Sequence, residues 1–554
     1  MLQDSLMARL DRLVTAKAVT QYGAVIGRQF PYDLLQAVSQ VDEAMLQHEL
    51  GRLVEAEIVF QRGVPPQAMY TFKHALIQDA AYQSLLRSTR QQYHQRIAQV
   101  LEAQFPEIAE ARPELLAHHY TEAGLIAQAV GYWQKAGQSA IQRSAHVEAI
   151  GHLTRGLALL KTQPETQAQA QHELHLLMLL GPVYMATTGY GAAEVLHTYG
   201  RARALCQQLG HTPQTLPALL ALARLTMIRA QHHDALALGQ QCLALAHQQD
   251  DPALLAEAHE AIGKPCALRG DGGAARTYLE QALRLYQAQP RPVRSAVQDP
   301  QITCLFALTW ALLPLGYPHQ ALACVHQALA LAQALAHPFS LAFATNATGI
   351  VHQLRREPQA AHAQVEASMQ VNEAQGFPML VGFNQVLWGW TLAMQGQTED
   401  GLTQIQQGLA NNRSTGHAVF YPWGLTCLAE VYGQAGQSGA ALTVVAEALT
   451  VIDTTEEHLW EAELHRLKGA LLLQQTPDNA TEAEVCFHHA ISIAQSQQAK
   501  SWELRAATSL ARLWQQQGKR QEAHDLLAPV YEWFTEGFDT ADLQDAKSLL
   551  DALE

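Results

Sequence analysis

Charged residues are scarce in this chain, at 16% of 554 residues where about a quarter is usual. The net charge of −15 and the pI near 5.9 predict no nucleic-acid partner, because a surface that binds phosphates needs an excess of Lys and Arg. The 7 cysteines are scattered and form neither a CxxC pair nor a disulfide-like framework. We therefore expect buried, reduced thiols in a cytoplasmic protein.

Long apolar runs are also missing. The longest extends from Leu174 to Met185, about a dozen residues, which is too short to span a bilayer. The N-terminus, MLQDSLMARLDRL, carries a charge every few residues and lacks the apolar centre of a signal peptide. The sequence thus predicts no contact with a membrane.

Motifs typical of catalytic sites are also scarce. No GxxxxGK[ST] phosphate loop and no GxSxG occurs in the sequence. The segment His172-Glu173-Leu174-His175 places its histidines three residues apart, where a zinc-protease helix needs four. The pairs His118-His119, His232-His233 and His488-His489 are interpreted as solvated. We predict no enzyme active site, no metal site and no cofactor.

The strongest pattern is a repeated set of small residues. Eight of them follow one another at intervals of 40, 46, 40, 40, 40, 42 and 40 residues. They are Ala235, Ala275, Ala321, Ala361, Gly401, Ala441, Ala483 and Ala523. Four residues after each stands a mostly larger one: Gly239, Leu279, Val325, Val365, Ile405, Val445, Phe487 and Leu527. Twelve to fourteen residues before each stands another mostly small one: Ala223, Gly263, Thr309, Gly349, Gly389, Ala429, Gly469 and Ala511.

Small residues on two facing helices allow a close approach, and a larger side chain fills the gap beside them. A fixed period near 40 residues therefore predicts an all-α, right-handed α-solenoid of helix pairs. The small-residue spacing resembles the tetratricopeptide repeat, which Ala429, Tyr432, Gly436, Ala441 and Val445 follow closely. The usual repeat has 34 residues, so longer helices are expected here. A HEAT-like pair also fits the period, but the Ala and Gly placement disfavours it.

Four domains are predicted. Residues 1–88 begin with helices, including one at 2–19, and Ile58–Phe60 and Met69–Phe72 then form a β-hairpin; this order is typical of a winged helix. The helix that would read DNA, from about Asp42 to Ile58, is acidic, so a packing role is favoured over DNA binding. Residues 89–210 are irregular tetratricopeptide-like helices, 211–537 the regular solenoid, and 538–554 a capping helix.

The N-terminal motifs resemble the region that follows the nucleotide-binding domain in STAND-type signalling ATPases, with a MalT-like tetratricopeptide region. Most similar are bacterial proteins that join an adenylate/guanylate cyclase, an ATPase and a tetratricopeptide tail. The matching stretches are Asp4–Leu13, Gly23–Phe30, Phe72–Tyr82, Leu115–Tyr120, Trp133–Leu160 and Trp533–Asp539. The resemblance implies that His74 can sense bound nucleotide. The alternative is a histidine that caps its own helix, and the phosphate-loop domain itself is not encoded here.

The first helix of each pair lines the concave face of a tetratricopeptide solenoid. Repeat positions 2, 5, 9 and 12 of the central units predict an aromatic trough of Phe306, Trp310, Phe343, Asn346, Gln353, Phe383, Trp390 and Trp423. The flanking units supply charge: Glu257, Glu260 and Lys264 on one side, and Glu463, Arg466, Arg505 and Arg512 on the other. Such a trough suits an extended peptide or a partner helix. The alternative is that these aromatics pack between neighbouring first helices.

The leading hypothesis is a non-enzymatic scaffold or sensor tail. Its solenoid binds a protein or peptide partner, and its winged helix couples binding to an ATPase or cyclase domain in the same or another chain. The alternative is the sensor part of a transcriptional regulator that binds a small inducer. A hydrolase hidden among the histidines has the weakest support.

Overall fold

A computed structural model describes residues 16–143, 145–189, 191–210, 215–249, 251–288, 299–375 and 377–554. The predicted helix at 2–19 and the motif Asp4–Leu13 lie largely or wholly outside the described residues. The chain divides after Val183 into two compact units, called unit 1 and unit 2, and the division falls inside helix α11 (Gln167–Thr188). The boundaries of the four predicted domains stay predictions.

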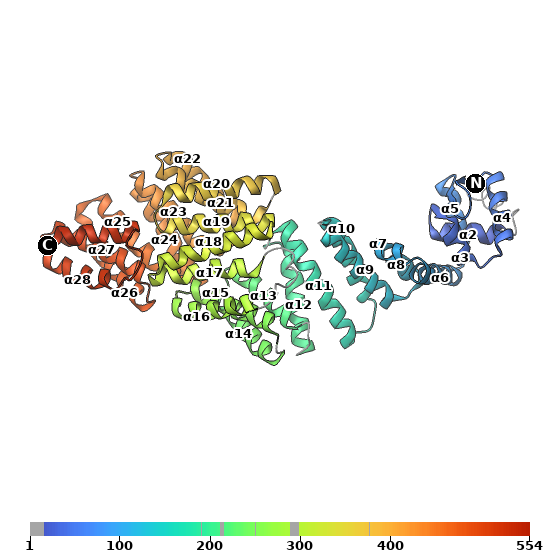
Figure 1. Cartoon of the computed structure of the whole chain (residues 1–554), viewed down its shortest axis with the longest axis horizontal. Coiled ribbons are helices and arrows are strands. Elements are labelled where there is room, and N and C mark those ends of the chain that lie inside the picture. The colour runs from blue at the N-terminus through green and yellow to red at the C-terminus, as the bar shows by residue number, and fades with distance from the viewer. Residues whose placement is uncertain are drawn as a thin grey trace. The chain divides into compact units, whose positions relative to one another are not determined.

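Unit 1 begins with helices alternating with a small antiparallel sheet (Figure 1). The elements are α2 (Ala16–Ile26), β1 (Gln29–Pro31), α3 (Tyr32–Ser39), α4 (Glu43–Glu55), β2 (Val59–Arg62), β3 (Met69–Phe72) and α5 (Ala75–Gln83). The sheet order is β1-β3-β2, with Phe30 opposite Tyr70 and Val59 opposite Phe72. The predicted hairpin is confirmed, and the third strand, β1, was not predicted from the sequence.

Helices fill the rest of unit 1: α6 (Arg87–Gln104), α7 (Pro106–Ala111), α8 (Pro113–Ala123), α9 (Ile126–Gln142), α10 (His146–Leu160) and most of α11. Helices α7 and α8 are separate because Pro113 lacks the N–H that would continue α7 and instead starts α8. One hydrophobic core runs from the sheet into α6, α8 and α9. The stacked rings of Tyr22 and Tyr93, 3.8 Å apart, belong to this junction.

Unit 2 contains α12 (Ala193–Leu209) followed by helix pairs, coloured green to red in Figure 1. The pairs are α13 (Thr215–Ile228) with α14 (His232–Gln249), α15 (Pro252–Leu268) with α16 (Gly272–Ala288), α17 (Pro300–Leu315) with α18 (Pro318–Leu335), α19 (Pro338–Leu354) with α20 (Pro358–Gln375), α21 (Pro378–Met394) with α22 (Thr398–Ser414), α23 (Tyr421–Gln434) with α24 (Ser438–Thr455), α25 (Glu461–Gln475) with α26 (Ala480–Ser496), and α27 (Lys500–Gln516) with α28 (Arg520–Glu532). Short 3-10 turns, η1 (His458–Trp460) and η2 (Pro477–Asn479), precede α25 and α26, and α29 (Ala541–Leu553) ends the chain. The all-α solenoid is confirmed.

Local sequence explains where many of these helices start. Proline occupies the first position of α15 and α17, where a missing N–H costs nothing. Asp251 and Asp299 stand just before them, and each carboxylate accepts hydrogen bonds from two backbone N–H groups of the first turn. These caps fix the residue at which each of the two helices begins.

The repeated small residues lie where two helices of a pair touch. All eight of the leading set are buried in the second helices, as are the eight residues four positions later. A Cβ added to Gly389 on α21 would lie 2.5 Å from the carbonyl oxygen of Gly401 on α22. Similarly, a Cβ on Gly469 would lie 2.7 Å from the Phe487 ring. The small residues are therefore required by the close approach of the helices.

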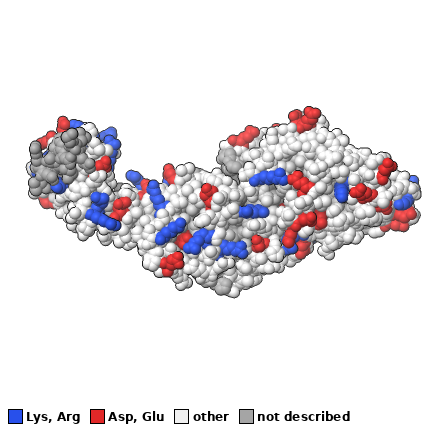
Figure 2. Space-filling view, turned by 180° about the vertical axis from the view of Figure 1, so that it is seen from behind, with Lys and Arg blue, Asp and Glu red and all other residues white. Residues whose placement is uncertain are grey.

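The first helices of successive pairs also contact one another, which makes them the inner layer of unit 2. Two of them far apart in the sequence, α17 and α27, are also in contact. Within the described ranges, none of the helices combines the length and the apolar character needed to cross a membrane. On the face drawn in Figure 2, the sparse Lys, Arg, Asp and Glu are interspersed between wide uncharged areas.

Candidate partner-binding site

The inner layer of unit 2 contains a polar cavity of about 170 Å³. Its walls come from the C-terminal end of α19, from α23, η1, α25 and α27, and from α29. We call it the arginine pocket, after its charged lining of Arg356, Arg466, Arg505, Arg512, Glu430, Glu463, Asp542 and Asp545. Four of these residues are the charged concave positions that the repeat pattern predicted next to the aromatic trough.

Helix α27 supplies one wall of the arginine pocket. Arg505, Thr508, Ser509 and Arg512 recur at spacings of three and four residues, so that they share one face of the helix. The opposite face carries the buried residues Leu510 and Leu513, which belong to the C-terminal core. Because the core holds the helix in place, the arginines are presented toward the cavity from a rigid element.

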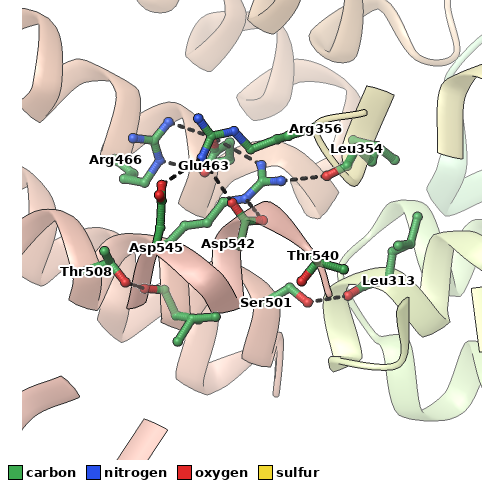
Figure 3. A network of polar contacts seen from close by, with 12 residues as sticks. Leu313, Leu354, Arg356, Glu463, Arg466, Ser501, Thr508, Thr540, Asp542 and Asp545 are labelled. Atoms are coloured by element: carbon green, nitrogen blue, oxygen red, sulfur yellow. Dashed lines mark hydrogen bonds and ion pairs between the residues drawn. The ribbon is translucent and has the colours of Figure 1, made fainter. Parts of the chain in front are cut away.

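Glu463 on α25 organises the inner end of the pocket (Figure 3). Both its oxygens accept hydrogen bonds from Arg466, at 2.8 Å each, and one also lies 3.4 Å from Arg505. Burial alone would raise the pKa of Glu463, but Arg466 and Arg505 hold it below its ordinary value. Burial would likewise lower the pKa of Arg466, and Glu463 raises it above its ordinary value. All three groups therefore stay charged.

Three residues of the predicted trough support this pocket. Gln353 and Trp423 line its wall, where the Trp423 indole N–H donates to the side-chain oxygen Oε1 of Gln353 at 3.1 Å. Trp390 does not line it, but its indole N–H donates to Glu430 at 2.9 Å and so orients a lining carboxylate. The tryptophans are only 1–2% exposed, so they hold the pocket walls rather than offer their rings to a partner.

The remaining trough residues pack elsewhere. Phe306 contacts the rings of Trp310, Phe343 and Phe420, and Trp310 stacks edge-on with Phe420 at 4.7 Å. Phe383 packs edge-on against His417. Phe306 and Phe383 are buried, while Trp310 and Phe343 are partly exposed.

Asn346, the polar member of the trough, is also buried, and its amide donates to Asn384 at 2.8 Å. The rings of Phe306, Trp310 and Phe343 thus pack against one another, and the prediction that the trough contacts a partner stays a prediction.

Sequence reasoning missed half of the charged lining. Arg356 stands in a left-handed turn after α19, Glu430 lies on α23, and Asp542 and Asp545 lie on the C-terminal helix. The repeat period gave no signal for Arg356, Asp542 or Asp545, because these residues lie outside the helix pairs. The other predicted charged flank forms a cluster of its own, where Glu260 accepts hydrogen bonds from Tyr286 and Thr303.

His74 is the exposed N-cap residue of α5, and its side chain makes no capping hydrogen bond. The alternative that His74 caps its own helix is therefore wrong, and its nucleotide-sensing role stays a prediction. The interpretation of the paired histidines as solvated is wrong for His119 and His232, which are each 1% exposed. His119 hydrogen-bonds His94, and His232 lies 3.3 Å from the buried carboxylate of Glu457. Across the described residues, no group of three or more His, Cys, Asp or Glu side chains is arranged to hold a metal ion.

No known protein-family profile matches the chain. It is 26% identical over 516 residues to a protein of Rhizobium meliloti (strain 1021) that is itself described as uncharacterized. The match covers 92% of this chain and 50% of that protein, so this chain spans about half the length of its curated relative.

Solved structures share the fold at low identity. A Rap protein complexed with Competence and Sporulation Factor superposes with a TM-score of 0.51 and 13% identity, over 66% of this chain and 98% of that one. A Signal Transduction ATPase with Numerous Domains (STAND) protein with a tetratricopeptide repeat sensor, from Pyrococcus horikoshii, matches 98% of this chain and 65% of its own. Its TM-score is only 0.33 at 11% identity. The chain is therefore a tetratricopeptide-like helical solenoid.

Proposed function

We propose that this chain is a non-enzymatic interaction and sensor region that binds a protein or peptide partner in the arginine pocket. The observation that carries this proposal is the pocket itself, an open, charged cavity on the inner layer of a helical solenoid. Guanidinium groups recognise carboxylates through paired, geometrically specific hydrogen bonds. Inner surfaces of such solenoids are extended binding surfaces.

The Rap protein was solved with a bound factor, which supports a binding role for the solenoid of this chain. In this proposal the partner contacts the charged lining, with Gln353 and Trp423 as its floor. Trp390 orients Glu430, and the remaining trough residues act by packing; they are Phe306, Trp310, Phe343, Asn346 and Phe383. In this proposal the partner therefore contacts charged side chains instead of the aromatic rings of the trough.

We further propose that the chain is the sensor tail of a larger STAND-type ATPase or cyclase signalling protein. The order α2, β1, α3, α4, β2, β3 is that of a winged helix, and the N-terminal motifs resemble the post-ATPase region. The twofold greater length of the Rhizobium meliloti relative is compatible with an added domain. His74, exposed at the start of α5, remains the candidate contact to a nucleotide held by that domain.

Affinity capture with a charge reversal in the pocket tests the binding role. Arg512 is half-exposed, so Arg512→Glu should leave folding intact while it repels a partner carboxylate. Arg413→Glu is the matched control, because Arg413 is also exposed, on the second helix α22 and paired with Glu447. We expect a discrete protein or peptide captured by the wild type and by Arg413→Glu, and lost with Arg512→Glu.

Equal capture by Arg512→Glu and the wild type would contradict the pocket as the site. Circular dichroism of both variants establishes that they are folded. Hydrolysis of ATP or GTP by the purified chain, above a boiled control, would contradict the non-enzymatic role.

A further inference from the structure

The C-terminal helix α29 places two carboxylates in the arginine pocket (Figure 3). Asp542 accepts a hydrogen bond from Nε of Arg505 at 2.7 Å and lies 3.3 Å from Nη1 of Arg356. Asp545 lies 3.3 Å from the same Arg356 nitrogen and 3.5 Å from Arg512. The two aspartates are three residues apart, so they project from one face of the helix on successive turns.

These carboxylates balance the charge of the pocket. Without them, the lining holds four arginines against two carboxylates, Glu430 and Glu463. Each aspartate therefore satisfies an arginine in the way that the carboxylate of a bound partner would. In effect, α29 carries an internal copy of an acidic ligand.

The ion pairs between α29 and the arginines differ in solvent exposure from the inner end of the pocket to its mouth. The side chains of Arg505 and Asp542 are 14% and 16% exposed, and Arg505 is held further by the Leu354 carbonyl at 2.6 Å. Arg356, Arg512 and Asp545 are 48%, 51% and 44% exposed. Ion pairs in water contribute little, so the outer contacts of Asp545 are exchangeable while the inner pair is anchored.

Helix α29 need not detach for such an exchange. Its apolar stripe, with Leu543, Leu549, Leu550 and Leu553, is buried in the C-terminal hydrophobic core. A change of side-chain rotamer at Asp545 releases Arg512 and removes one of the two carboxylates that Arg356 contacts, the other being Asp542. The pocket can thus open to a ligand without unfolding of the chain terminus.

We propose that the arginine pocket recognises an acidic peptide whose two carboxylates lie one helical turn apart, and that Asp545 is a resident competitor which the peptide displaces. This inference rests on the proposed binding function of the pocket. The partner is a peptide with Asp or Glu at positions i and i+3. Asp545 lowers the affinity of the pocket for this peptide. The peptide carboxylates pair with Arg356 and Arg512 at the mouth of the pocket.

Fluorescence anisotropy with the full-length chain tests this inference. The probe is an acetylated, amidated alanine-based helical peptide with Asp at two positions three residues apart, and its control carries Asn at both. We expect the Asp peptide to bind the wild type, and Asp545→Asn to bind it roughly fivefold more tightly, because one exposed competing contact is removed. Arg356→Gln/Arg512→Gln should abolish binding, and Arg413→Gln should leave it unchanged.

Each other outcome is decisive. Equal affinity of Asp545→Asn and the wild type overturns the resident competitor and leaves the pocket as a binding site. Binding of the Asn peptide as tightly as the Asp peptide, or failure of both to bind any variant, overturns the acidic partner, while the capture experiment still decides the proposed function. Full binding by Arg356→Gln/Arg512→Gln overturns the pocket itself and the proposed function with it. Thermal melts of all variants confirm that they are folded.

Discussion

Two buried histidines in unit 1 face each other through the same ring nitrogen. Nδ1 of His94 lies 2.8 Å from Nδ1 of His119, and Nε2 of His94 lies 3.0 Å from the Tyr82 hydroxyl. One proton between the two Nδ1 atoms makes a hydrogen bond. A second proton would place two N–H groups against each other, and they would repel. Burial, with His118 and Arg90 nearby, lowers the pKa of His94 to about 3, and burial with His94 lowers that of His119 well below its ordinary value.

This pair makes the stability of unit 1 fall in mild acid. The unfolded histidines bind protons near pH 6.5 while the folded ones do not, so stability is complete above that pH and is lost as the pH falls toward 3. One pH unit below 6.5, each histidine costs about 1.4 kcal/mol. Intrinsic amide exchange slows over this range, so the quantity to compare is the protection factor, the ratio of intrinsic to observed exchange rate. We expect the protection factors of α6 and α8 to fall between pH 7 and 5.5, and to fall less in His94→Phe/His119→Phe. An equal fall in that variant would contradict this origin.

The burial of one member in the pairs His118-His119 and His232-His233 could have been predicted from the sequence. Neighbours on a helix point about 100° apart, so one of the two faces inward wherever the helix packs. His232 stands three residues before the small residue Ala235 and therefore shares its buried face. The aromatic trough is a different matter, because the rings of Phe306 and Phe420 meet across 114 positions of sequence, a distance that the repeat period does not encode.

At the scale of elements, the backbones of α21 and α22 lie in close contact. A Cβ on Gly401 would lie 2.6 Å from the Gly389 carbonyl oxygen, and one on Gly408 would lie 2.6 Å from that of Gly382. Real Cβ atoms do not approach backbone oxygens so closely, so any side chain must push the helices apart. Backbone-to-backbone contact of this kind specifies which faces of the two helices meet.

Gly401→Ala should therefore destabilise unit 2. Overpacking of a close contact costs about 1–3 kcal/mol, which exceeds the gain of up to about 1 kcal/mol from a better helix former. Gly200→Ala in α12 is the control, because Gly200 is exposed and nothing lies within 4 Å of an added Cβ. Urea unfolding followed by circular dichroism should show a lower midpoint for Gly401→Ala and an equal or higher one for Gly200→Ala. A higher midpoint for Gly401→Ala would contradict the close packing.

The helix pairs could be read from the sequence because each repeat buries its small residues on its nearest neighbours. The short elements could not be predicted from the sequence. The three residues of β1 form a strand only because β3, some 40 residues later, pairs with them. Similarly, α7 is a helix of six residues with no buried side chain, so it has no apolar face by which to predict it.

At the scale of the whole molecule, unit 2 closes on itself between its middle and its C-terminal end. Ser501 on α27 donates to the Leu313 carbonyl of α17 at 2.6 Å. Glu536 accepts hydrogen bonds from the backbone N–H groups of His319 and Gln320, at 2.8 and 3.1 Å, and so caps the start of α18. The pocket depends on this closure, since Arg356 comes from the middle of the unit and its aspartate partners come from the end. A period of 40 residues specifies neighbours in the stack but not which pairs meet after a turn of the superhelix.

Arg355 is the buried centre of this closure, at 3% exposure. Its guanidinium donates to the Pro318 carbonyl at 3.1 Å and lies 2.8 Å from Glu357 and 3.3 Å from Asp539. Arg355→Met keeps the length of the side chain but leaves these acceptors without their donor. The carboxylates of Glu357 and Asp539 are 31% and 61% exposed, so water can solvate them after the substitution. Loss of a hydrogen bond from a charged donor costs about 1.5–3 kcal/mol, whereas an exposed pair contributes at most about 1 kcal/mol.

Hydrogen exchange distinguishes a local role of Arg355 from a general loss of stability. In Arg355→Met we expect faster exchange in 536–554 and at the start of α18, with α13 and α14 unchanged, because only the former segments meet at the closure. Arg413→Met, which removes an exposed pair with Glu447, should leave all four regions at wild-type rates. Uniform acceleration throughout unit 2 would mean that Arg355 stabilises the solenoid as a whole. Unchanged exchange in α29 would mean that the leucine stripe alone seats this helix, and that the ion network on its other face is free to serve a partner.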